Sequence, residues 1–238
     1  YMFVTTKGIV LRTYPFKDKK LISKIYTEDR GLVSFIIRKN KDQIILSQPL
    51  NIVEITYRES NTHSLFYITD CSADYVYRDL MTNGEKLSFA LLISEVLNKC
   101  LTEINIELFD FIINSFKWFD NTKGSIQGFD ILFLIKFCNM NGIQPSSINL
   151  DLEAPYALDI IEGKYINNII NINLPHIIPQ KESAIIYELS ILEYDNLSMY
   201  TIVEEKSSII LDYLIKYISI HLADISKLNS IKILKQLI

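Results

Sequence analysis

The chain has 238 residues, of which 49% are hydrophobic and 22% are charged, and its formal net charge is −4. This composition is typical of a globular protein and excludes an intrinsically disordered chain. No apolar run reaches the roughly 18 residues that a membrane helix needs, and the N-terminal residues lack the basic and apolar blocks of a signal peptide. We therefore expect a cytoplasmic protein.

Three cysteines lie far apart in the sequence, at Cys71, Cys100 and Cys138. Their number is odd and no two of them form a CxxC motif, so the sequence supports neither a disulfide framework nor a zinc knuckle. We expect three ordinary core thiols in a reducing compartment, and no metal or other cofactor.

The net charge is distributed unevenly along the chain. Residues 1–45 contain ten Lys or Arg and four Asp or Glu, a net charge of +6, so the remaining residues carry −10. Such asymmetry between parts of a chain suggests that the basic part meets a polyanion.

Residues 1–78 are rich in β-branched and aromatic side chains that alternate at period two, as strands do. Five strands are expected, at residues 5–13, 21–29, 31–39, 49–59 and 64–76. Five short strands in succession, joined by polar turns and without intervening helices, predict a small barrel or a sandwich.

The apolar residues change to helical spacing after Arg78. Thr82 and Glu85 have the T-x-x-E spacing of a capping box, which predicts a helix that begins there and runs to Leu101. Later helices are expected at residues 107–119, 127–141, 182–194 and 203–222, with a short last one from Ser230 to Leu237.

Between the expected helices, residues 146–182 look irregular, apart from a possible short ribbon at 157–168. The chain is therefore expected to be of the α+β class. We place an N-terminal barrel domain at residues 1–79 and a helical domain at residues 80–238.

The sequence contains no motif of a known catalytic chemistry. It has neither a P-loop nor a GxGxxG motif, and its seven glycines stand too far apart to cradle phosphates. His63, His176 and His221 are isolated from one another in the sequence, and no nucleophile-elbow motif is present. We expect no catalytic residue and no enzymatic activity.

Cations flank the predicted strands instead. Lys17, Lys19 and Lys20 follow the first strand, Lys24 lies in the second, and Arg38, Lys39 and Lys41 follow the third. A five-stranded barrel with cationic loops and exposed rings is a common binder of single-stranded nucleic acid, in which each stacked base contributes about 1–3 kcal/mol. The nearby rings are those of Tyr14, Phe16, Tyr26 and Phe35. The alternative is a charged rim that only keeps the sheet edges soluble.

The order of these segments resembles that of the RecO family of bacterial recombination mediators. The resemblance is carried by "TKGIVLRTYPFKDKKLISKIYTEDRGLVSFIIRK" and "LSQPLNIVEITY" in the first part of the chain. It continues in "FALLISEVLNKCL", "ELFDFIINSFKWFD" and "FLIKFCNMNGIQP", and in the closing "YISIHLADISKLNSIKILKQLI". These motifs are diffuse apolar patterns, and together they cover nearly the whole chain.

The resemblance implies an N-terminal OB-fold barrel followed by a helical domain. It also implies a non-enzymatic, nucleoid-associated DNA-repair protein that binds single- and double-stranded DNA and anneals complementary strands. Its partners would be RecR, with which it helps to load RecA, and the single-strand-binding protein SSB. The acidic C-terminal tail of SSB would occupy a groove of the helical domain.

Two features differ from the family pattern. Some members carry a four-cysteine zinc site in the region that corresponds to residues 146–182, and this segment contains no cysteine here. Members are often basic, whereas this chain is acidic beyond residue 45, which limits the expected share of the helical domain in DNA binding.

The candidate site residues are all cations. The expected DNA-binding residues are Lys7, Arg12, Lys19, Lys20, Lys24, Arg38, Lys39 and Lys41. The expected ligands of the SSB tail are Lys99, Lys136 and Lys216, chosen by their placement on predicted helices. Two other interpretations remain open: a protein–protein adaptor whose barrel binds DNA weakly or not at all, and an RNA-binding barrel.

Overall fold

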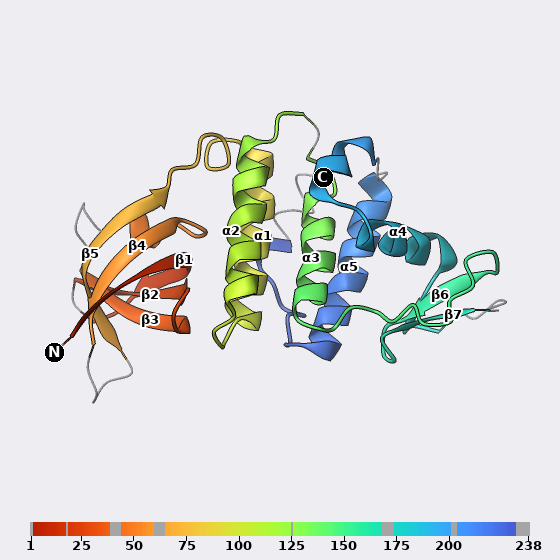
Figure 1. Ribbon diagram of the computed structural model, residues 1–238, viewed down its shortest axis with the longest axis horizontal. Coiled ribbons are helices and arrows are strands. Elements are labelled where there is room, and N and C mark those ends of the chain that lie inside the picture. Colours follow the sequence, from red (N-terminus) through yellow and green to blue (C-terminus); the bar gives the residue numbers. More distant parts are fainter. Residues whose placement is uncertain are drawn as a thin grey trace. The chain divides into compact units, whose positions relative to one another are not determined.

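The computed structural model describes residues 2–17, 19–38, 44–59, 65–124, 126–167, 174–200 and 204–231. The chain divides into two compact units, residues 1–121 and 122–238, and each is described by itself. The first unit holds a barrel and two helices, and the second holds further helices and a small sheet, so the α+β prediction is confirmed (Figure 1). Strands give way to helices near residue 79, as expected, but a functional domain boundary at that residue stays a prediction.

The five predicted strands form a closed barrel in the order β1-β2-β3-β5-β4. Their bounds are β1 (Phe3–Pro15), β2 (Lys20–Thr27), β3 (Gly31–Arg38), β4 (Ile52–Arg58) and β5 (Phe66–Tyr75). All neighbouring strands pair antiparallel except β3 and β5, which run parallel. The arrangement is that of an OB-like barrel, in agreement with the family resemblance.

Aromatic rings fill the centre of the barrel. Phe35, Tyr57 and Phe66 form a cluster with centroid distances of 5.1, 5.4 and 6.3 Å. Phe35 and Tyr57 are completely buried. Since successive side chains of a strand point to opposite faces, these inward residues determine which of their neighbours point outward.

A short 3-10 helix, η1 (Ile44–Ser47), contributes Leu46 to the barrel core. The hydroxyl groups of Thr13 and Ser23 donate hydrogen bonds to the carbonyl oxygen of Leu46, at 2.7 and 3.0 Å. These bonds attach η1 to β1 and β2, and they show that Thr13 and Ser23 point to the inner face.

Two helices complete the first unit, α1 (Gly84–Cys100) and α2 (Ile106–Asn121). The predicted capping box is wrong by one residue, because Asn83 rather than Thr82 is the N-cap of α1. The side-chain oxygen of Asn83 accepts hydrogen bonds from the amides of Glu85 and Lys86, at 3.0 and 3.1 Å. An asparagine amide is a good N-cap acceptor, whereas the Thr82 hydroxyl donates to the carbonyl oxygen of Asp79.

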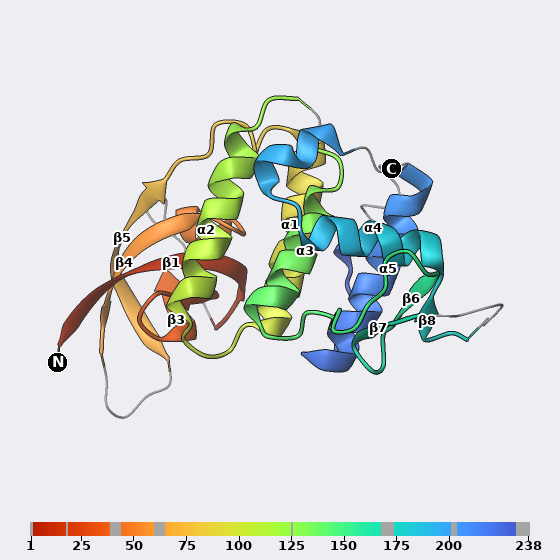
Figure 2. The same cartoon turned by 45° about the vertical axis from the view of Figure 1, so that its right-hand side comes forward.

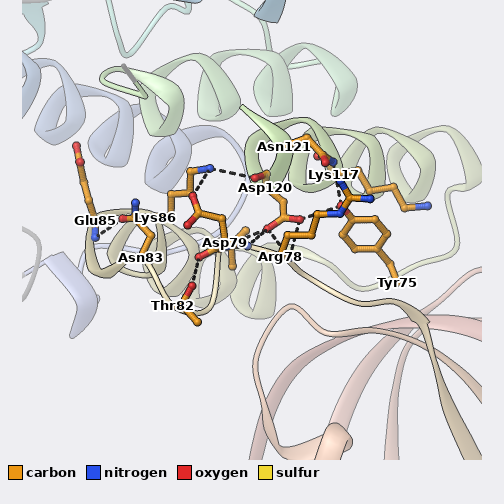
Figure 3. A network of polar contacts seen from close by, with 11 residues as sticks. Tyr75, Arg78, Asp79, Thr82, Asn83, Glu85, Lys86, Lys117, Asp120 and Asn121 are labelled. Atoms are coloured by element: carbon orange, nitrogen blue, oxygen red, sulfur yellow. Dashed lines mark hydrogen bonds and ion pairs between the residues drawn. The ribbon is translucent and has the colours of Figure 1, made fainter. Parts of the chain in front are cut away.

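The chain between β5 and α1 is held by one buried carboxylate at the end of α2 (Figure 3). Asp120 accepts hydrogen bonds from the backbone amides of Arg78, Asp79 and Leu80, at 2.8–3.1 Å. It also accepts one from the Tyr75 hydroxyl, at 2.9 Å. These donors would otherwise be buried without partners, so the carboxylate fixes the path by which the chain leaves the barrel.

A buried lysine joins the same network. Lys86 of α1 is 2% exposed, and its ammonium group forms an ion pair with Asp79 at 2.9 Å. The same group donates to the backbone carbonyl oxygen of Asp120 at 3.1 Å and lies 5.6 Å from the centroid of the Phe119 ring. Because the charge is paired and hydrogen-bonded, its burial is tolerated.

The second unit contains a three-stranded antiparallel sheet and helices (Figure 2). Its elements are α3 (Phe129–Met140), β6 (Tyr156–Asp159), β7 (Lys164–Asn167), β8 (Ile177–Ile178), α4 (Gln180–Ser190), η2 (Tyr194–Met199) and α5 (Glu204–His221). The predicted ribbon is confirmed as β6 and β7. The predicted last helix, from Ser230 to Leu237, falls mostly outside the described residues. Across the described part of the chain, no helix has the length and apolar character needed to cross a membrane.

Tyrosine rings hold the small sheet against α4. Tyr156, Tyr165 and Tyr187 make three edge-to-face contacts, with centroids 5.6–6.3 Å apart. The Ser183 hydroxyl accepts from the amide of Leu158 and donates to a carbonyl oxygen of β8. The residues present in this segment do not fit a four-cysteine zinc site, because it contains no cysteine. Its described residues also form no cluster of three or more potential metal ligands.

The three thiols are free, as expected. Cys100 and Cys138 are buried and Cys71 is half-buried. Burial raises the pKa of the Cys100 thiol to about 12, so this thiol remains protonated at neutral pH and is unreactive.

We expect Asp120→Asn to lower the free energy of unfolding by about 2–4 kcal/mol at pH 7, because several buried amides lose a charged acceptor. Burial alone would raise the pKa of the Asp120 carboxyl. The amides of Arg78, Leu80 and Asp79 and the hydroxyl of Tyr75 lower it, and the net pKa lies below its ordinary value of 3.8. The stabilisation is therefore present above that ordinary value and is lost as the pH falls through the lower pKa of the folded state.

Urea unfolding of both proteins at pH 7 and at pH 3 measures this effect. The difference between wild type and variant should shrink at the lower pH. Asp110→Asn, at an exposed position of the same helix, is the matched control and should change stability by less than about 0.5 kcal/mol. An equally small change for Asp120→Asn would refute the role assigned to Asp120.

The tyrosine cluster leads to a second expectation. Incubation with EDTA should leave the melting temperature within about 1 °C of its starting value, since the sheet is held by ring contacts rather than by a metal. Tyr165→Ala should lower the free energy of unfolding by about 3 kcal/mol. Tyr165→Phe keeps the ring contacts and should lower it much less. Thermal unfolding checks all three, and a clear loss of stability in EDTA would contradict the expectation.

Candidate nucleic-acid interface

One row of side chains crosses the outer surface of four barrel strands. Residues that lie opposite each other in paired strands point to the same face, and Phe35 points inward, so its neighbour Ile36 points outward. The register places Tyr14 opposite Ile22, Ile22 opposite Ile36, and Ile36 beside Tyr67. These four outward residues, Tyr14, Ile22, Ile36 and Tyr67, are called the tyrosine row below.

Two pairs of cations border this row, one on each side. Lys20 lies opposite Arg38 on β2 and β3, and Arg12 lies opposite Lys24 on β1 and β2. Alternate residues of a strand are about 7 Å apart, which is the spacing between the tyrosine row and each pair. The Lys20 ammonium group lies 5.6 Å from the centroid of the Tyr67 ring. Four of the eight predicted DNA-binding residues thus share one face.

Three more of the predicted residues belong to turns beside this face. Lys19 is exposed in the turn between β1 and β2, next to the Lys20/Arg38 pair. Lys39 and Lys41 follow β3 and lie outside the described residues. Their role as phosphate ligands stays a prediction.

Lys7, the eighth predicted residue, is engaged with acids elsewhere on the barrel. Its ammonium group forms an ion pair with Asp74 at 2.9 Å and lies opposite Glu54 in the register. Hydrogen bonding and charge from Asp74 raise the pKa of Lys7. Arg30 is paired in the same way with Glu59. Because these groups already contact carboxylates, Lys7 and Arg30 are poor candidates for phosphate binding.

The outer surface of the barrel therefore has two electrostatic parts. The strands β1, β2 and β3 carry the cations around the tyrosine row, whereas β4 and β5 carry Glu54, Asp70 and Asp74, together with Arg58 at the end of β4 opposite Tyr67. A polyanion is attracted to the first part and repelled by the second. The division gives the barrel one side on which a phosphate backbone can lie.

Comparison with known proteins agrees with this geometry. Residues 2–75 match the family model described as "Recombination protein O N terminal". The chain is also similar along its length to proteins named DNA repair protein RecO. The relative from Phocaeicola vulgatus is 27% identical over 245 residues, and that from Flavobacterium johnsoniae is 28% identical over 247 residues, each alignment covering 99% of both chains. The relative from Bacteroides fragilis is 26% identical over 244 residues, again with 99% of both chains covered.

The chain is therefore similar to RecO proteins, in its N-terminal residues 2–75 and along 99% of its length. These relatives are named as DNA repair proteins.

Two of the rings proposed to stack on bases cannot do so in this protein. Tyr26 and Phe35 are completely buried. Phe35 lies in the barrel core, and Tyr26 points outward but packs against Phe109 of α2, with ring centroids 6.0 Å apart. Of the other two, Phe16 is 37% exposed and Tyr14 is half-buried in the tyrosine row.

Sequence reasoning did not select Tyr67, whose side chain is 48% exposed. It lies in the fifth predicted strand between Phe66 and Ile68, which both point into the barrel. Alternation alone could have identified it as an outward ring. Its position beside Ile36 depends on the pairing of β5 with β3, which no local pattern indicates.

The second unit has an apolar groove of about 730 Å³ beside α5. Its walls include Ile160, Ile215 and Ile220, and its charged lining residues are Lys216 and Asp212. Lys216 is exposed, with its ammonium group 5.6 Å from the centroid of the Tyr213 ring. An apolar channel bordered by a cation is suited to an acidic peptide with an apolar end.

The other two predicted ligands of the SSB tail lie in different surroundings. Lys136 of α3 forms an ion pair with Glu193 at 3.1 Å and lies over the Tyr194 ring, and it does not line the groove. Lys99 lies in the last turn of α1, in the first compact unit. Within the second unit, Lys216 is thus the predicted residue that is combined with an apolar groove.

Proposed function

We propose that this protein is a member of the RecO family and a mediator of DNA repair and recombination, which binds single- and double-stranded DNA on its barrel and anneals complementary strands. The proposal is supported chiefly by the four cations, Arg12, Lys20, Lys24 and Arg38, that surround one outward row of the barrel. Similarity to RecO proteins supports the same role. The acids Glu54, Asp70 and Asp74 disfavour phosphate binding on the outer surface of β4 and β5 beyond the tyrosine row.

Annealing of arbitrary complements requires contacts that do not depend on base sequence. Lysine and arginine contacts to phosphates have this property, because phosphates position a strand without carrying sequence information. A cationic surface also reduces the repulsion between two strands that approach each other. We therefore assign the four cations, together with Lys19 and the loop residues Lys39 and Lys41, to phosphate binding.

The proposal includes partners. We infer that the acidic C-terminal tail of SSB binds the groove of the second unit, with its apolar residues against the isoleucine side chains and a carboxylate near Lys216. RecR is proposed as the second partner, and the complex would help to load RecA on strands coated by SSB. A barrel that acts only as a protein–protein adaptor is the rival, and the titration below distinguishes the two.

DNA binding should depend steeply on salt. If about four of these assigned cations, Lys24 and Arg38 among them, contact phosphates of a single strand at once, the plot of log K against log salt concentration should have a slope of about −3. The double variant Lys24→Gln with Arg38→Gln should reduce that slope to about −1.5, because two phosphate contacts are lost. Fluorescence anisotropy with oligonucleotides of mixed sequence measures both values.

The matched control removes the same charge from other positions of the first unit. Lys7→Gln with Lys117→Gln should leave the slope close to that of the wild type, since Lys7 is paired with Asp74 and Lys117 lies over the Tyr75 ring. Affinity that does not depend on salt would refute phosphate binding. Absence of DNA binding by a folded protein would favour the adaptor.

A peptide with the sequence of the SSB tail should bind the isolated full-length chain, and Lys216→Glu should weaken that binding about tenfold, equal to about 1.4 kcal/mol. Lys181→Glu makes the same charge change at an exposed position of α4 that does not line the groove, and it should have little effect. Isothermal titration calorimetry checks both. If Lys136→Glu weakened binding while Lys216→Glu did not, the tail would bind elsewhere on the second unit.

A further inference from the structure

The tyrosine row has the composition of a surface for bases rather than for phosphates. Tyr67 is 48% exposed at one end of the row, and Tyr14 is half-buried at the other. Between them Ile22 and Ile36 are each 6% exposed, although they point out of the barrel. Tyr67 is therefore the accessible ring of the row, Tyr14 is partly accessible, and the two isoleucines between them are buried beneath the surface.

Cations border the tyrosine row on both sides, and Arg58 of β4, opposite Tyr67 in the register, adds another at the Tyr67 end. The Lys20/Arg38 pair and the Arg12/Lys24 pair are each about 7 Å from the row along the strands. Long cationic side chains at that distance can reach the phosphates of a DNA strand whose bases lie on the tyrosine row. Lys20 also lies over the Tyr67 ring, with its ammonium group 5.6 Å from the ring centroid.

We propose that the tyrosine row is a base-stacking platform, with Tyr67 as its principal ring, and that it makes the barrel prefer single-stranded DNA to duplex. The inference rests on the proposed DNA-binding function and adds the part of the ligand that the row contacts. Bases of a single strand expose their faces, and every base has such a face, so stacking on Tyr67 does not depend on sequence. The bases of a duplex are stacked on one another and cannot reach the ring.

The same division explains how an annealed product leaves the surface. Two single strands are each held by phosphate contacts and by stacking. When their bases pair, the stacking contacts are lost and only the phosphate contacts remain. The product is therefore bound more weakly than its two precursors, by the amount that the row contributes.

Three proteins test the inference, namely the wild type, Tyr67→Leu and Tyr67→Phe, each with a single strand and a duplex of the same length. Tyr67→Leu keeps an apolar side chain and every charge but removes the ring. Its affinity for the single strand should fall about tenfold, with duplex affinity and the salt slope unchanged. Tyr67→Phe keeps the ring and should bind the single strand as the wild type does. Circular dichroism confirms that each variant is folded.

The outcomes separate the inference from the proposed function. If the wild type shows the expected salt slope but Tyr67→Leu binds single strands normally, the platform is refuted and phosphate binding stands. An equal loss for single strand and duplex would also overturn the inference, because the ring would then act through the barrel structure. If wild-type affinity does not depend on salt, the proposed function itself fails.

Discussion

Closure of the barrel depends on two neighbouring residue pairs between β3 and β5. Phe35 lies beside Phe66, and Ile36 lies beside Tyr67. The first pair points inward and joins the aromatic core, whereas the second points outward and extends the tyrosine row. This short parallel contact therefore completes both the hydrophobic interior and the candidate surface for DNA. A shift of one residue in its register would exchange the two faces and bury Tyr67.

The strands and most helices could be predicted because their signals are local. Alternation at period two identified all five barrel strands, and helical spacing identified the helices. Local patterns could not place Tyr67 beside Ile36, because that pairing joins distant segments. They also could not show that Tyr26 is covered by Phe109 of α2, since an outward position does not imply an exposed one. The cap of α1 was misplaced because Thr82 and Asn83 are both good N-cap residues and differ only in which one reaches the helix amides.

The cations of the N-terminal segment differ in ways that their number does not reveal. The sequence shows a basic segment, and the structure shows that its cations differ in the side chains that surround them. Arg12, Lys20, Lys24 and Arg38 border the tyrosine row, while Lys7 and Arg30 are paired with carboxylates. Asp74 of β5 and Glu59, which follows β4, lie beyond the basic segment, whereas Asp29, the other acid near Arg30, belongs to it. The separation of charge along the sequence thus becomes a separation between two sides of one barrel.

The tyrosine-supported sheet of the second unit has a chemical consequence. Thiolate ligands of zinc are oxidised readily, and their oxidation releases the metal. The segment at residues 146–182 contains no cysteine and is held by the rings of Tyr156, Tyr165 and Tyr187, so it has no such group to lose. Peroxide stress breaks DNA and attacks metal–thiolate sites at the same time. This part of the fold contains no metal–thiolate site that peroxide could attack under the conditions in which broken DNA has to be repaired.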